Sequence, residues 1–314
     1  MAEMLLTVAI CTLNRAESLR RTLDSLAAMG VPCHLGWEVV VVNNNCTDHT
    51  DEVINAFNDR LPIHREFEPQ RGHSRARNRA VEAAKGDYIV WTDDDVVVDP
   101  GWLAAYAEAF RRWPEAAVFG GRITPRYEMP VVKWVAESEA LLGGPFAIRD
   151  LGDKELPLSI AEGRVPYGAN FALRAVEQLA FRYNPELGLG PGRRRLGEEV
   201  DVIERILGSG AVGYWVPAAQ VEHCISHDRQ TVSYIERYFA GAGETSTLMG
   251  GNREMPLWFG VPRWLWRGLI DGWLRYHLHR RFSPAPVWVN HLRTYAFSRG
   301  AIRTLLKMRF ELFK

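Results

Sequence analysis

The sequence is poor in the features that mark several classes of protein. It has four scattered cysteines and no C-x-x-C pair: Cys11, Cys33, Cys46 and Cys224. This spacing indicates neither a disulfide framework nor a zinc site, and it fits a reducing compartment. No stretch is apolar over the roughly 18 residues that a membrane-spanning helix needs. The N-terminus carries an acid where a signal peptide has basic residues. We therefore expect a cytoplasmic protein.

The chain also lacks net charge, since 38 Lys and Arg balance 38 Asp and Glu. This balance gives no sign of a nucleic-acid partner, and we predict none. The charge is nevertheless unevenly distributed. Residues 255–314 hold eleven Lys or Arg against two acids, a local balance of +9 that leaves −9 for residues 1–254. A basic segment of this kind either meets an anionic surface or forms the solvated face of a helix.

Short apolar runs alternate with segments of helical spacing in the first 124 residues. The runs that favour strands are residues 5–11, 37–42, 62–67 and 87–92, and helical spacing occurs in residues 17–29, 50–60 and 74–85. This alternation predicts an α/β fold with a mostly parallel sheet and helices on both faces. In such sheets ligands bind beyond the carboxyl ends of the strands, so polar residues there are candidates for a site.

The rest of the chain is less regular and then becomes helical. Gly and Pro are frequent in residues 125–162, which indicates loops and short elements. A helix is expected over residues 197–210, short strands over 212–217 and 221–224, and mostly helices from about 228. We predict two domains: a catalytic domain over 1–227, with a nucleotide-sugar-binding half (1–124) and an acceptor-binding half (125–227), and a helical, basic, Trp-rich region over 228–314.

Three aspartates in a row, Asp93, Asp94 and Asp95, follow the fourth predicted strand. Alternate side chains of an extended backbone point the same way, so Asp93 and Asp95 can converge while Asp94 points elsewhere. Two convergent carboxylates suit Mg²⁺ or Mn²⁺ held together with substrate phosphates. The alternative is that these acids cap the helix predicted over residues 99–110 and lie near its dipole.

A basic helix start follows the third predicted strand. Gly72 precedes a helix, and four arginines surround its beginning: Arg71, Arg75, Arg77 and Arg79. Backbone N–H groups, the helix dipole and guanidinium groups there could bind a phosphate. Residues 71, 75 and 79 share one face and Arg77 lies elsewhere, so one subset is solvated. Carboxylates, a cation and a basic helix start together indicate a site for a metal diphosphate.

Six segments of the chain resemble a known family. They are TVAICTLNR, VVVNNNCTD, RGHSRARNRAVEAAKGDYIVWTDDDV, YGANFALR, GEEVDV and VEHC, in this order between residues 5 and 225. Together they are similar to the family 2 glycosyltransferases, which are inverting enzymes of the GT-A (Rossmann-like) fold. The resemblance implies a metal-dependent enzyme with Mn²⁺ or Mg²⁺ as its cofactor. It also implies a nucleotide-sugar donor.

The resemblance also implies roles for particular residues. Asp95 matches the metal ligand of the family's D-x-D motif, Asp93 contacts the ribose or the metal, and Asp94 lies in the same nucleotide site. Thr12, Asn14 and Arg15 stand in the loop that meets the nucleotide, and Arg77 matches the basic residue associated with the diphosphate. Glu199 matches the general base, with Glu198 beside it, and His223 matches a histidine that completes metal coordination. From the residues alone, Glu198 and Glu199 could instead favour a helix start, and His223 could be structural.

Two departures from the family pattern affect this interpretation. Asn43 and Asn44 replace paired aspartates, one of which accepts a hydrogen bond from uracil. An amide oxygen can accept that bond as well, but the amide can also donate, so the base is less constrained. We expect UDP or dTDP rather than GDP. Glu199 replaces an aspartate and adds one methylene, which leaves it a competent base if the acceptor lies accordingly.

These features predict transfer of a sugar to an acceptor hydroxyl, with inversion, the acceptor being a glycan or a lipid-linked glycan. One alternative is a sugar nucleotidyltransferase, which ordinarily has a glycine-rich basic loop after the first strand, and residues 11–18 lack such a loop. A second alternative is a non-catalytic glycan-binding protein that kept the fold. The substitutions at Asn43, Asn44 and Glu199 are what support this second alternative.

Residues 256–281 form a basic, tryptophan-rich segment. Arg263, Arg267, Asp271 and Arg275 recur at every fourth position and so share one helical stripe. Five apolar residues are left largely to other faces: Trp266, Leu269, Ile270, Trp273 and Leu274. Such a helix suits the interface of an anionic membrane, on whose inner face the protein would be peripheral. The alternative is a helix packed on the catalytic domain with its arginines in water.

Overall fold

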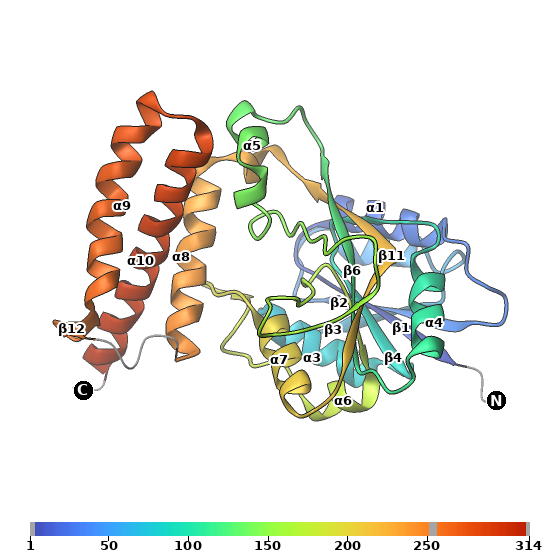
Figure 1. The fold of residues 1–314 in the computed structure, drawn as a ribbon. Helices are drawn as coiled ribbons and strands as arrows, with labels where there is room; N and C mark the ends of the chain where they lie inside the picture. The colour runs from blue at the N-terminus through green and yellow to red at the C-terminus, as the bar shows by residue number, and fades with distance from the viewer. Residues whose placement is uncertain (1–3, 251–255, 312–314) are drawn as a thin grey trace. The chain divides into compact units, whose positions relative to one another are not determined.

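The structure is a computed structural model that describes residues 4–250 and 256–311, without the side chains of residues 193, 194, 310 and 311. The chain divides into two compact units (Figure 1). The sheet unit comprises Met1–Arg126, Ala147–Pro191 and Glu198–Cys224, and the helical unit comprises Tyr127–Phe146, Gly192–Gly197 and Ile225–Lys314.

The first part of the sheet unit alternates strands and helices as the sequence predicts. Its elements are β1 (Leu5–Thr12), α1 (Ala16–Ala27), β2 (Gly36–Asn43), α2 (Thr50–Asn55), β3 (Ile63–Phe67), α3 (His73–Ala83) and β4 (Tyr88–Thr92). β1 pairs in parallel with both β2 and β4, and β2 pairs in parallel with β3. The carboxyl ends of these strands therefore meet at one edge of the sheet.

Antiparallel strands extend the sheet beyond β4. The further elements are β5 (Val96–Val98), α4 (Trp102–Arg112), β6 (Val118–Tyr127), β7 (Leu156–Pro157), β8 (Asn170–Arg174), α6 (Ala175–Ala180), β9 (Leu189–Gly190), α7 (Glu198–Gly208) and β11 (Gly213–Ile225). The strand order is β3-β2-β1-β4-β8-β6-β11-β5, with β7 beside β11. β8 is antiparallel to β4 and β6, and β11 is antiparallel to β5 and β7. The predicted α/β fold class is confirmed.

One predicted feature of this region is wrong. The two short strands expected over residues 212–217 and 221–224 are parts of one strand, β11, which continues through Pro217. A proline lacks the N–H that a central strand donates, so it suggests a strand end from sequence. Pro217 lies between the residues of β11 that pair with β7, Tyr214 and Trp215, and those that pair with β5, residues 221–223. It therefore belongs to neither of these two antiparallel pairings.

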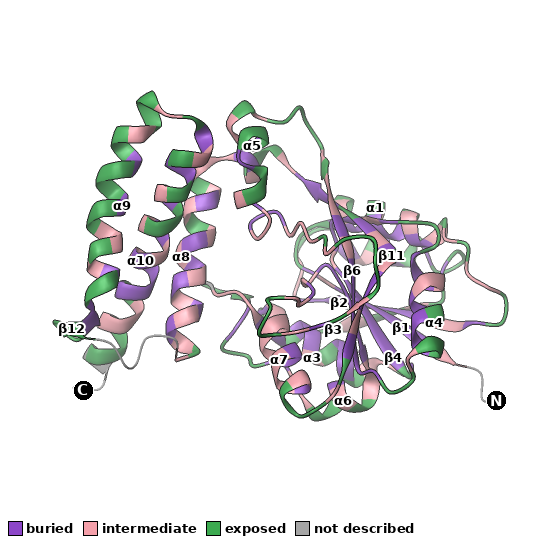
Figure 2. Ribbon diagram, viewed as in Figure 1, coloured by how far each residue is buried: buried purple, intermediate pink, exposed green. Residues whose placement is uncertain are grey.

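The core of the sheet unit consists of two apolar layers, one on each face of the sheet. On one face Leu6 and Val8 of β1 pack with residues of α1, α2 and α4, such as Leu19 and Tyr106. On the other face Ala9 of β1 and its neighbours in β2 pack with α3 and α7, for example through Ala80 and Ile203. β4 is buried over its whole length and β1 over most of it (Figure 2). The alternation of β1 residues between the layers explains why its sequence is apolar at nearly every position.

The helical unit is built mainly from three long helices. Its elements are α5 (Lys133–Glu137), η1 (Glu139–Leu141), β10 (Arg193–Arg194), η2 (His227–Gln230), α8 (Val232–Leu248), β12 (Leu257–Trp258), β13 (Val261–Pro262), α9 (Arg263–Phe282) and α10 (Ala285–Glu311). α10 packs along both α8 and α9 (Figure 1). The contact with α8 requires a glycine, because a Cβ on Gly300 would lie 2.0 Å from the carbonyl oxygen of Ala240. The predicted helical character of the chain from about residue 228 is confirmed.

Within the described residues, no helix combines the length and the hydropathy that crossing a bilayer requires.

Candidate active site

The residues predicted to form a site all belong to the sheet unit, and they gather where its parallel strands end. β1 ends at Thr12, β2 at Asn43 and β4 at Thr92, directly before the aspartate triplet. α7 begins at Glu198. Because parallel strands place their carboxyl ends at the same edge, segments far apart in the sequence contribute side chains to this region.

Two of the three aspartates are tied to the loop after β1. The Thr12 hydroxyl donates to Oδ2 of Asp94 at 2.7 Å. Nη1 of Arg15 donates to Oδ1 of Asp94 at 2.8 Å and to Oδ2 of Asp95 at 2.9 Å. Both aspartates are buried. One guanidinium therefore joins two neighbouring carboxylates, which relieves the repulsion between them.

The expectation that Asp94 points away from Asp95 is wrong. Residues 94 and 95 lie in a turn, so the alternation of an extended backbone does not apply to them. Asp93 instead lies beside Arg77, with 3.8 Å between its Oδ1 and Nη2 of the guanidinium. The triplet thus divides into a pair held by Arg15 and a separate carboxylate, Asp93, near Arg77.

Burial works against the charge of Asp94, and the two hydrogen-bond donors offset only part of that effect. Desolvation raises the pKa of Asp94, and the negative charge of Asp95 raises it further. The charge of Arg15 and the hydrogen bond from Thr12 lower the pKa of Asp94 again. The same pairing, with Asp94 as the larger contributor, raises the pKa of the Arg15 guanidinium. Arg15 therefore stays charged and fixes the loop after β1 against the triplet.

Asp95 also lies beside His223. The Nε2 atom of His223 is 3.3 Å from Oδ1 of Asp95, and both side chains are buried. His223 reaches this position because it pairs with Val96 in the β11–β5 ladder. Within the described residues, no group of three or more His, Cys, Asp and Glu side chains could hold a metal ion. The pair fits a cation that takes its other ligands from a diphosphate and from water, as Mg²⁺ and Mn²⁺ commonly do.

Arg77 is buried in a cage of aromatic rings. Its guanidinium carbon lies 5.4 Å from the ring centres of Trp91 and Phe171 and 5.3 Å from that of Tyr183. Nη2 donates to the carbonyl oxygen of Gly168 at 3.4 Å, and the buried Nη1 has no hydrogen-bond partner in the described part of the chain. Leaving a buried donor unpaired costs roughly 1–3 kcal/mol. A ligand oxygen or a water that pairs with Nη1 would remove this cost.

Glu198 and His73 connect α7 to the start of α3. The Nδ1 atom of His73 is 2.6 Å from Oε1 of Glu198, while Nε of Arg77 donates to Nε2 of His73 at 3.4 Å. Since an arginine Nε–H can only donate, Nε2 of His73 accepts and Nδ1 carries the proton. Burial raises the pKa of Glu198, but the His73 hydrogen bond and the Arg77 charge outweigh it. The pKa of Glu198 is lowered to about 2.

The pKa of Glu199 is shifted in the opposite direction from that of Glu198. Its side chain is half-buried, and burial together with the negative charge of Glu198 raises its pKa from 4.5 to about 7 in spite of the nearby Arg77 charge. Gly168 lies against this carboxylate, because a Cβ at that position would be 3.2 Å from Oε1 of Glu199 and 2.9 Å from Nη2 of Arg77. Two neighbouring carboxyls whose pKa values are pushed apart in this way can hold different protonation states near neutral pH. Glu199 is therefore suited to exchange a proton at neutral pH.

The three asparagines of the predicted site hold loops together. Asn14 has a left-handed backbone (φ 53°), and its Oδ1 accepts from the N–H of Thr47 at 2.7 Å. The side chain of Asn43 donates to Asp51 at 2.6 Å and accepts from the N–H of Cys46 at 2.7 Å. Asn44 likewise both donates to backbone carbonyls and accepts from the N–H of Gly72 at 2.8 Å. Contact of Asn43 and Asn44 with a nucleotide base stays a prediction.

Several residues that shape the site were not singled out from the sequence. They are His73, Trp91, Gly168, Phe171 and Tyr183. His73 and Trp91 lie inside the segments that carry the family resemblance, and so do Gly168 and Phe171. Tyr183 offers no such signal. Their roles depend on contacts between positions far apart in the chain, such as the 125 residues that separate His73 from Glu198.

We predict that Gly168→Ala lowers turnover by about a hundredfold, because small displacements of catalytic groups have effects of that size. The added methyl group would push against Nη2 of Arg77 and the Glu199 carboxylate. Turnover and the midpoint of thermal unfolding are the measurements. Gly208→Ala is the matched control, since no atom lies within 4 Å of the Cβ it would add. Equal turnover of the two variants would contradict the placement of Gly168 against these groups.

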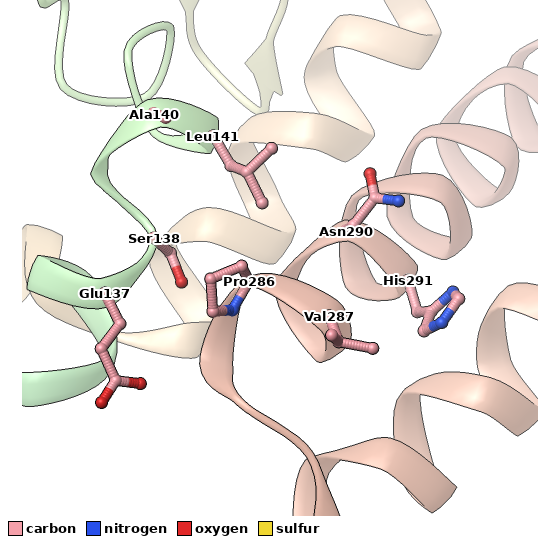
Figure 3. A pocket seen from close by; sticks show the side chains of 8 residues that line it. All are labelled: Glu137, Ser138, Ala140, Leu141, Pro286, Val287, Asn290 and His291. Carbon is pink, nitrogen blue, oxygen red and sulfur yellow. The ribbon is translucent and has the colours of Figure 1, made fainter.

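A concave surface of a different kind lies in the helical unit. A cavity of about 560 Å³ is lined by Glu137, Ser138, Ala140, Leu141, Pro286, Val287, Asn290 and His291. Figure 3 shows Glu137 and His291 at opposite ends of it, with apolar side chains between them. The ionisable groups of this cavity are thus separated, unlike the paired carboxyls of the sheet unit. We therefore place the candidate active site in the sheet unit alone.

The family model described as "Glycosyl transferase family 2" matches residues 7–163, half of the chain. The chain belongs to this family, and it is a glycosyltransferase that moves a sugar from a nucleotide sugar. It is 26% identical over 243 residues to succinoglycan biosynthesis protein ExoM of Rhizobium meliloti (strain 1021), covering 76% of this chain and 72% of that one. It is 27% identical over 257 residues to pre-mycofactocin glycosyltransferase of Mycobacterium tuberculosis, covering 80% of this chain but 49% of the relative.

Two solved structures share the fold. The mannosyltransferase PcManGT from Pyrobaculum calidifontis, solved with GDP-Man and Mn²⁺, matches with a TM-score of 0.63 at 15% identity, over 96% of this chain and 87% of that one. S. aureus TarS 1-349, solved with UDP-GlcNAc, matches with a TM-score of 0.56 at 14% identity, over 96% of this chain and 92% of that one. At this identity the likeness establishes the fold, and the predicted family and enzyme class rest on the sequence matches.

Proposed function

We propose that this glycosyltransferase is a metal-dependent, inverting enzyme in which Glu199 is the general base. The observation that carries the proposal is the Glu198–Glu199 pair beside Arg77, where one carboxyl is held ionised and the other has its pKa raised to about 7. A base works best when its pKa lies near the working pH. In this proposal Glu199 takes the proton of the acceptor hydroxyl as that oxygen attacks the anomeric carbon from the face opposite the leaving diphosphate.

Asp95 and His223 would hold the Mn²⁺ or Mg²⁺ ion, with Asp93 as a further candidate ligand or ribose contact. When bound, such an ion neutralises charge on the diphosphate. Arg77 would add a fixed positive charge through its unpaired Nη1, and Arg15, fixed by Asp94 and Asp95, would hold the loop that carries Thr12 and Asn14 against the nucleotide. A Mn²⁺ ion in the structure of the mannosyltransferase supports this proposal.

The proposal extends to the donor and the acceptor. We propose that residues 1–124 bind the nucleotide sugar and residues 125–227 bind the acceptor, within a catalytic domain over 1–227. The donor is a UDP or dTDP sugar rather than a GDP sugar, and solved neighbours hold UDP-GlcNAc in one case and GDP-Man in another. The acceptor is a glycan or a lipid-linked glycan, and similarity to a protein of succinoglycan biosynthesis supports a role in making a polysaccharide.

The test is release of nucleoside diphosphate from a panel of uridine, thymidine and guanosine sugars, with Mn²⁺ and with Mg²⁺. Glycans and lipid-linked glycans are supplied as acceptors, and EDTA is added in a parallel series. We expect turnover of a uridine or thymidine sugar that EDTA abolishes and that Mn²⁺ restores. Turnover that is the same in EDTA would contradict the metal requirement, and turnover confined to guanosine sugars would contradict the donor assignment.

We predict that Glu198→Gln moves the acidic limb of the pH–rate profile to lower pH by roughly one unit, the order of shift that one nearby charge produces. The charge of Glu198 raises the pKa of Glu199, so its removal lowers that pKa. A base must be ionised to act, and activity would then persist at more acidic pH. The glutamine can still accept the hydrogen bond from His73. A lowered plateau with an unmoved limb would contradict this coupling between the two glutamates.

A further inference from the structure

Helix α9 has one buried face. Leu265, Gly272 and Tyr276 are buried, and Leu265 packs with Ala301 and Ile302 of α10. Trp266 and Leu269 are partly buried against the same cluster. The apolar residues at these positions are thus accounted for by packing within the helical unit. The sequence pattern does not distinguish Trp266 and Leu269, which pack inward, from Ile270, Trp273 and Leu274, which are exposed.

Part of the exposed side of α9 is apolar. Ile270, Leu274 and Leu278 are 59%, 55% and 60% exposed, and their spacing of four residues places them along one line of the helix. Trp273 on one flank and Phe282 at the C-terminal end are exposed as well. We call these five residues the outer stripe of α9. Figure 2 shows α9 exposed over most of its length.

Two exposed aromatic residues also lie just before the N-terminal end of α9. Phe259, in the turn between β12 and β13, is 82% exposed, and Trp258 of β12 is 54% exposed. The Arg263 guanidinium lies 5.4 Å from the ring centre of Trp258. Single exposed apolar residues are ordinary on a protein surface, but a continuous row of this kind marks an interaction surface.

The outer stripe is flanked by positive charge. α9 carries five arginines and one aspartate: Arg263, Arg267, Arg275, Arg280, Arg281 and Asp271. Asp271 is paired with Arg275 at 2.7 Å. Arg267 and Arg281 are both exposed, and neither takes part in an ion pair with another described residue. Their charge is therefore available to an external anionic partner.

We propose that the outer stripe of α9 docks on the surface of an anionic lipid bilayer. A helix whose exposed face combines aliphatic residues, tryptophan, phenylalanine and arginine lies in the plane of a membrane interface, with its apolar side chains below the headgroups. The arginines extend their charged ends toward the lipid phosphates while their methylene stems stay in the apolar layer. This docking does not depend on the proposed catalytic mechanism, since it concerns different residues in the other unit.

A second copy of the chain is a less suitable occupant of this surface. In a two-fold dimer through the outer stripe, the exposed arginines beside the stripe in one copy would approach those of the other, and like charges across an interface cost several kcal/mol. An anionic bilayer instead supplies a counter-charge to each arginine. Charge complementarity together with the row of exposed apolar residues therefore favours the lipid surface over self-association.

The test is flotation of the full chain with vesicles of phosphatidylcholine alone or with 30% phosphatidylglycerol, a composition chosen to be anionic at roughly the level of cell membranes. We expect binding to the anionic vesicles, and we expect Leu274→Asp with Leu278→Asp to weaken it by tenfold or more, on the order expected when buried apolar contacts with lipid are lost. The matched control is Val176→Asp with Leu179→Asp on α6, two residues exposed at 63% and 51% in the sheet unit. The control should bind as the wild type does.

Charge is tested separately from the apolar contact. Arg267→Glu with Arg281→Glu should weaken binding by about fivefold for each arginine removed, and added salt should weaken binding of the wild type. Absence of wild-type binding to anionic vesicles would overturn the proposal. Equal loss of vesicle binding in the α6 control would also overturn it. So would a wild-type protein that does not bind vesicles but forms a dimer, if Leu274→Asp with Leu278→Asp converts that dimer to a monomer.

Discussion

Replacing Asp95 by asparagine is expected to lower turnover by about a thousandfold, since a cation contributes several kcal/mol of charge stabilisation. Asparagine keeps the shape of the side chain and one oxygen, but it removes the negative charge that faces Arg15 and His223. The variant should bind Mn²⁺ more weakly, and the Mn²⁺ concentration that gives half of the maximal rate should rise. Nucleoside diphosphate release measured across a Mn²⁺ titration is the assay.

The control for this variant is Asp59→Asn, which makes the same chemical change on the exposed surface of the sheet unit. It should retain the turnover of the wild type. Asp94→Asn is informative as well, because Asp94 is held by both Thr12 and Arg15 and its loss should displace the loop after β1. If Asp95→Asn kept full turnover with an unchanged Mn²⁺ requirement, the assignment of Asp95 as a metal ligand would be wrong.

Much of the fold could be predicted because the first half of the sheet unit follows local rules. Apolar runs of strand length alternate with segments of helical spacing from β1 to β4. This alternation arises because the residues that face the two layers of the core must be apolar. The antiparallel part of the sheet could not be read in the same way. The pairing of β8 with both β4 and β6 depends on contacts between distant segments, and the length of β11 is hidden by Pro217.

The sequence predicts which residues form the candidate site but not how their side chains contact one another. The family resemblance indicates Asp95, Arg77 and Glu199, and each lies at the carboxyl edge of the sheet or at the start of α7. The sequence did not reveal that Asp94 and Asp95 share Arg15, because this requires the turn at residues 94 and 95. It did not reveal the aromatic cage of Arg77 either, since the three rings come from β4, β8 and the segment after α6.

For helix α9, the sequence predicts the charged stripe but not the packing of the apolar residues. Helical spacing predicts the stripe of charge on α9, but it does not tell which apolar residues pack inward. The contact with α10 decides this, because Leu265 and Leu269 face Ala301 and Ile302 while Ile270 and Leu274 stay exposed. Residues 251–255 and 312–314, which belong to the basic segment or adjoin it, lie outside the described residues.

Replacing Glu199 by glutamine is expected to lower turnover by roughly 10²–10⁴-fold, the usual contribution of a general base. Glutamine keeps the length of the side chain and its place against Gly168, but it cannot accept a proton from the acceptor hydroxyl. Binding of the nucleotide should change little, because Glu199 is assigned to the acceptor. The loss should therefore appear in kcat, with a donor KM close to that of the wild type.

The same variant should be more stable than the wild type above neutral pH. The pKa of Glu199 is about 7 in the folded protein and 4.5 in a free side chain, so ionising it in the folded state costs free energy. The cost is absent below pH 4.5, grows between pH 4.5 and 7, and is complete above pH 7. Glutamine avoids it, and we expect about 1–3 kcal/mol of added stability at pH 8 but no gain at pH 4.5. Thermal unfolding at the two pH values measures the difference.

The most direct measurement is nucleoside diphosphate release by wild type, Glu199→Gln and Glu204→Gln, followed at pH 8 with a donor that the wild type turns over. Glu204→Gln makes the same change on the same helix, away from Gly168, and should keep the turnover of the wild type. We expect Glu199→Gln to lose at least a hundredfold in kcat while its unfolding midpoint rises. Wild-type turnover by Glu199→Gln, or a loss of turnover accompanied by a loss of stability, would contradict the assignment of Glu199 as the base.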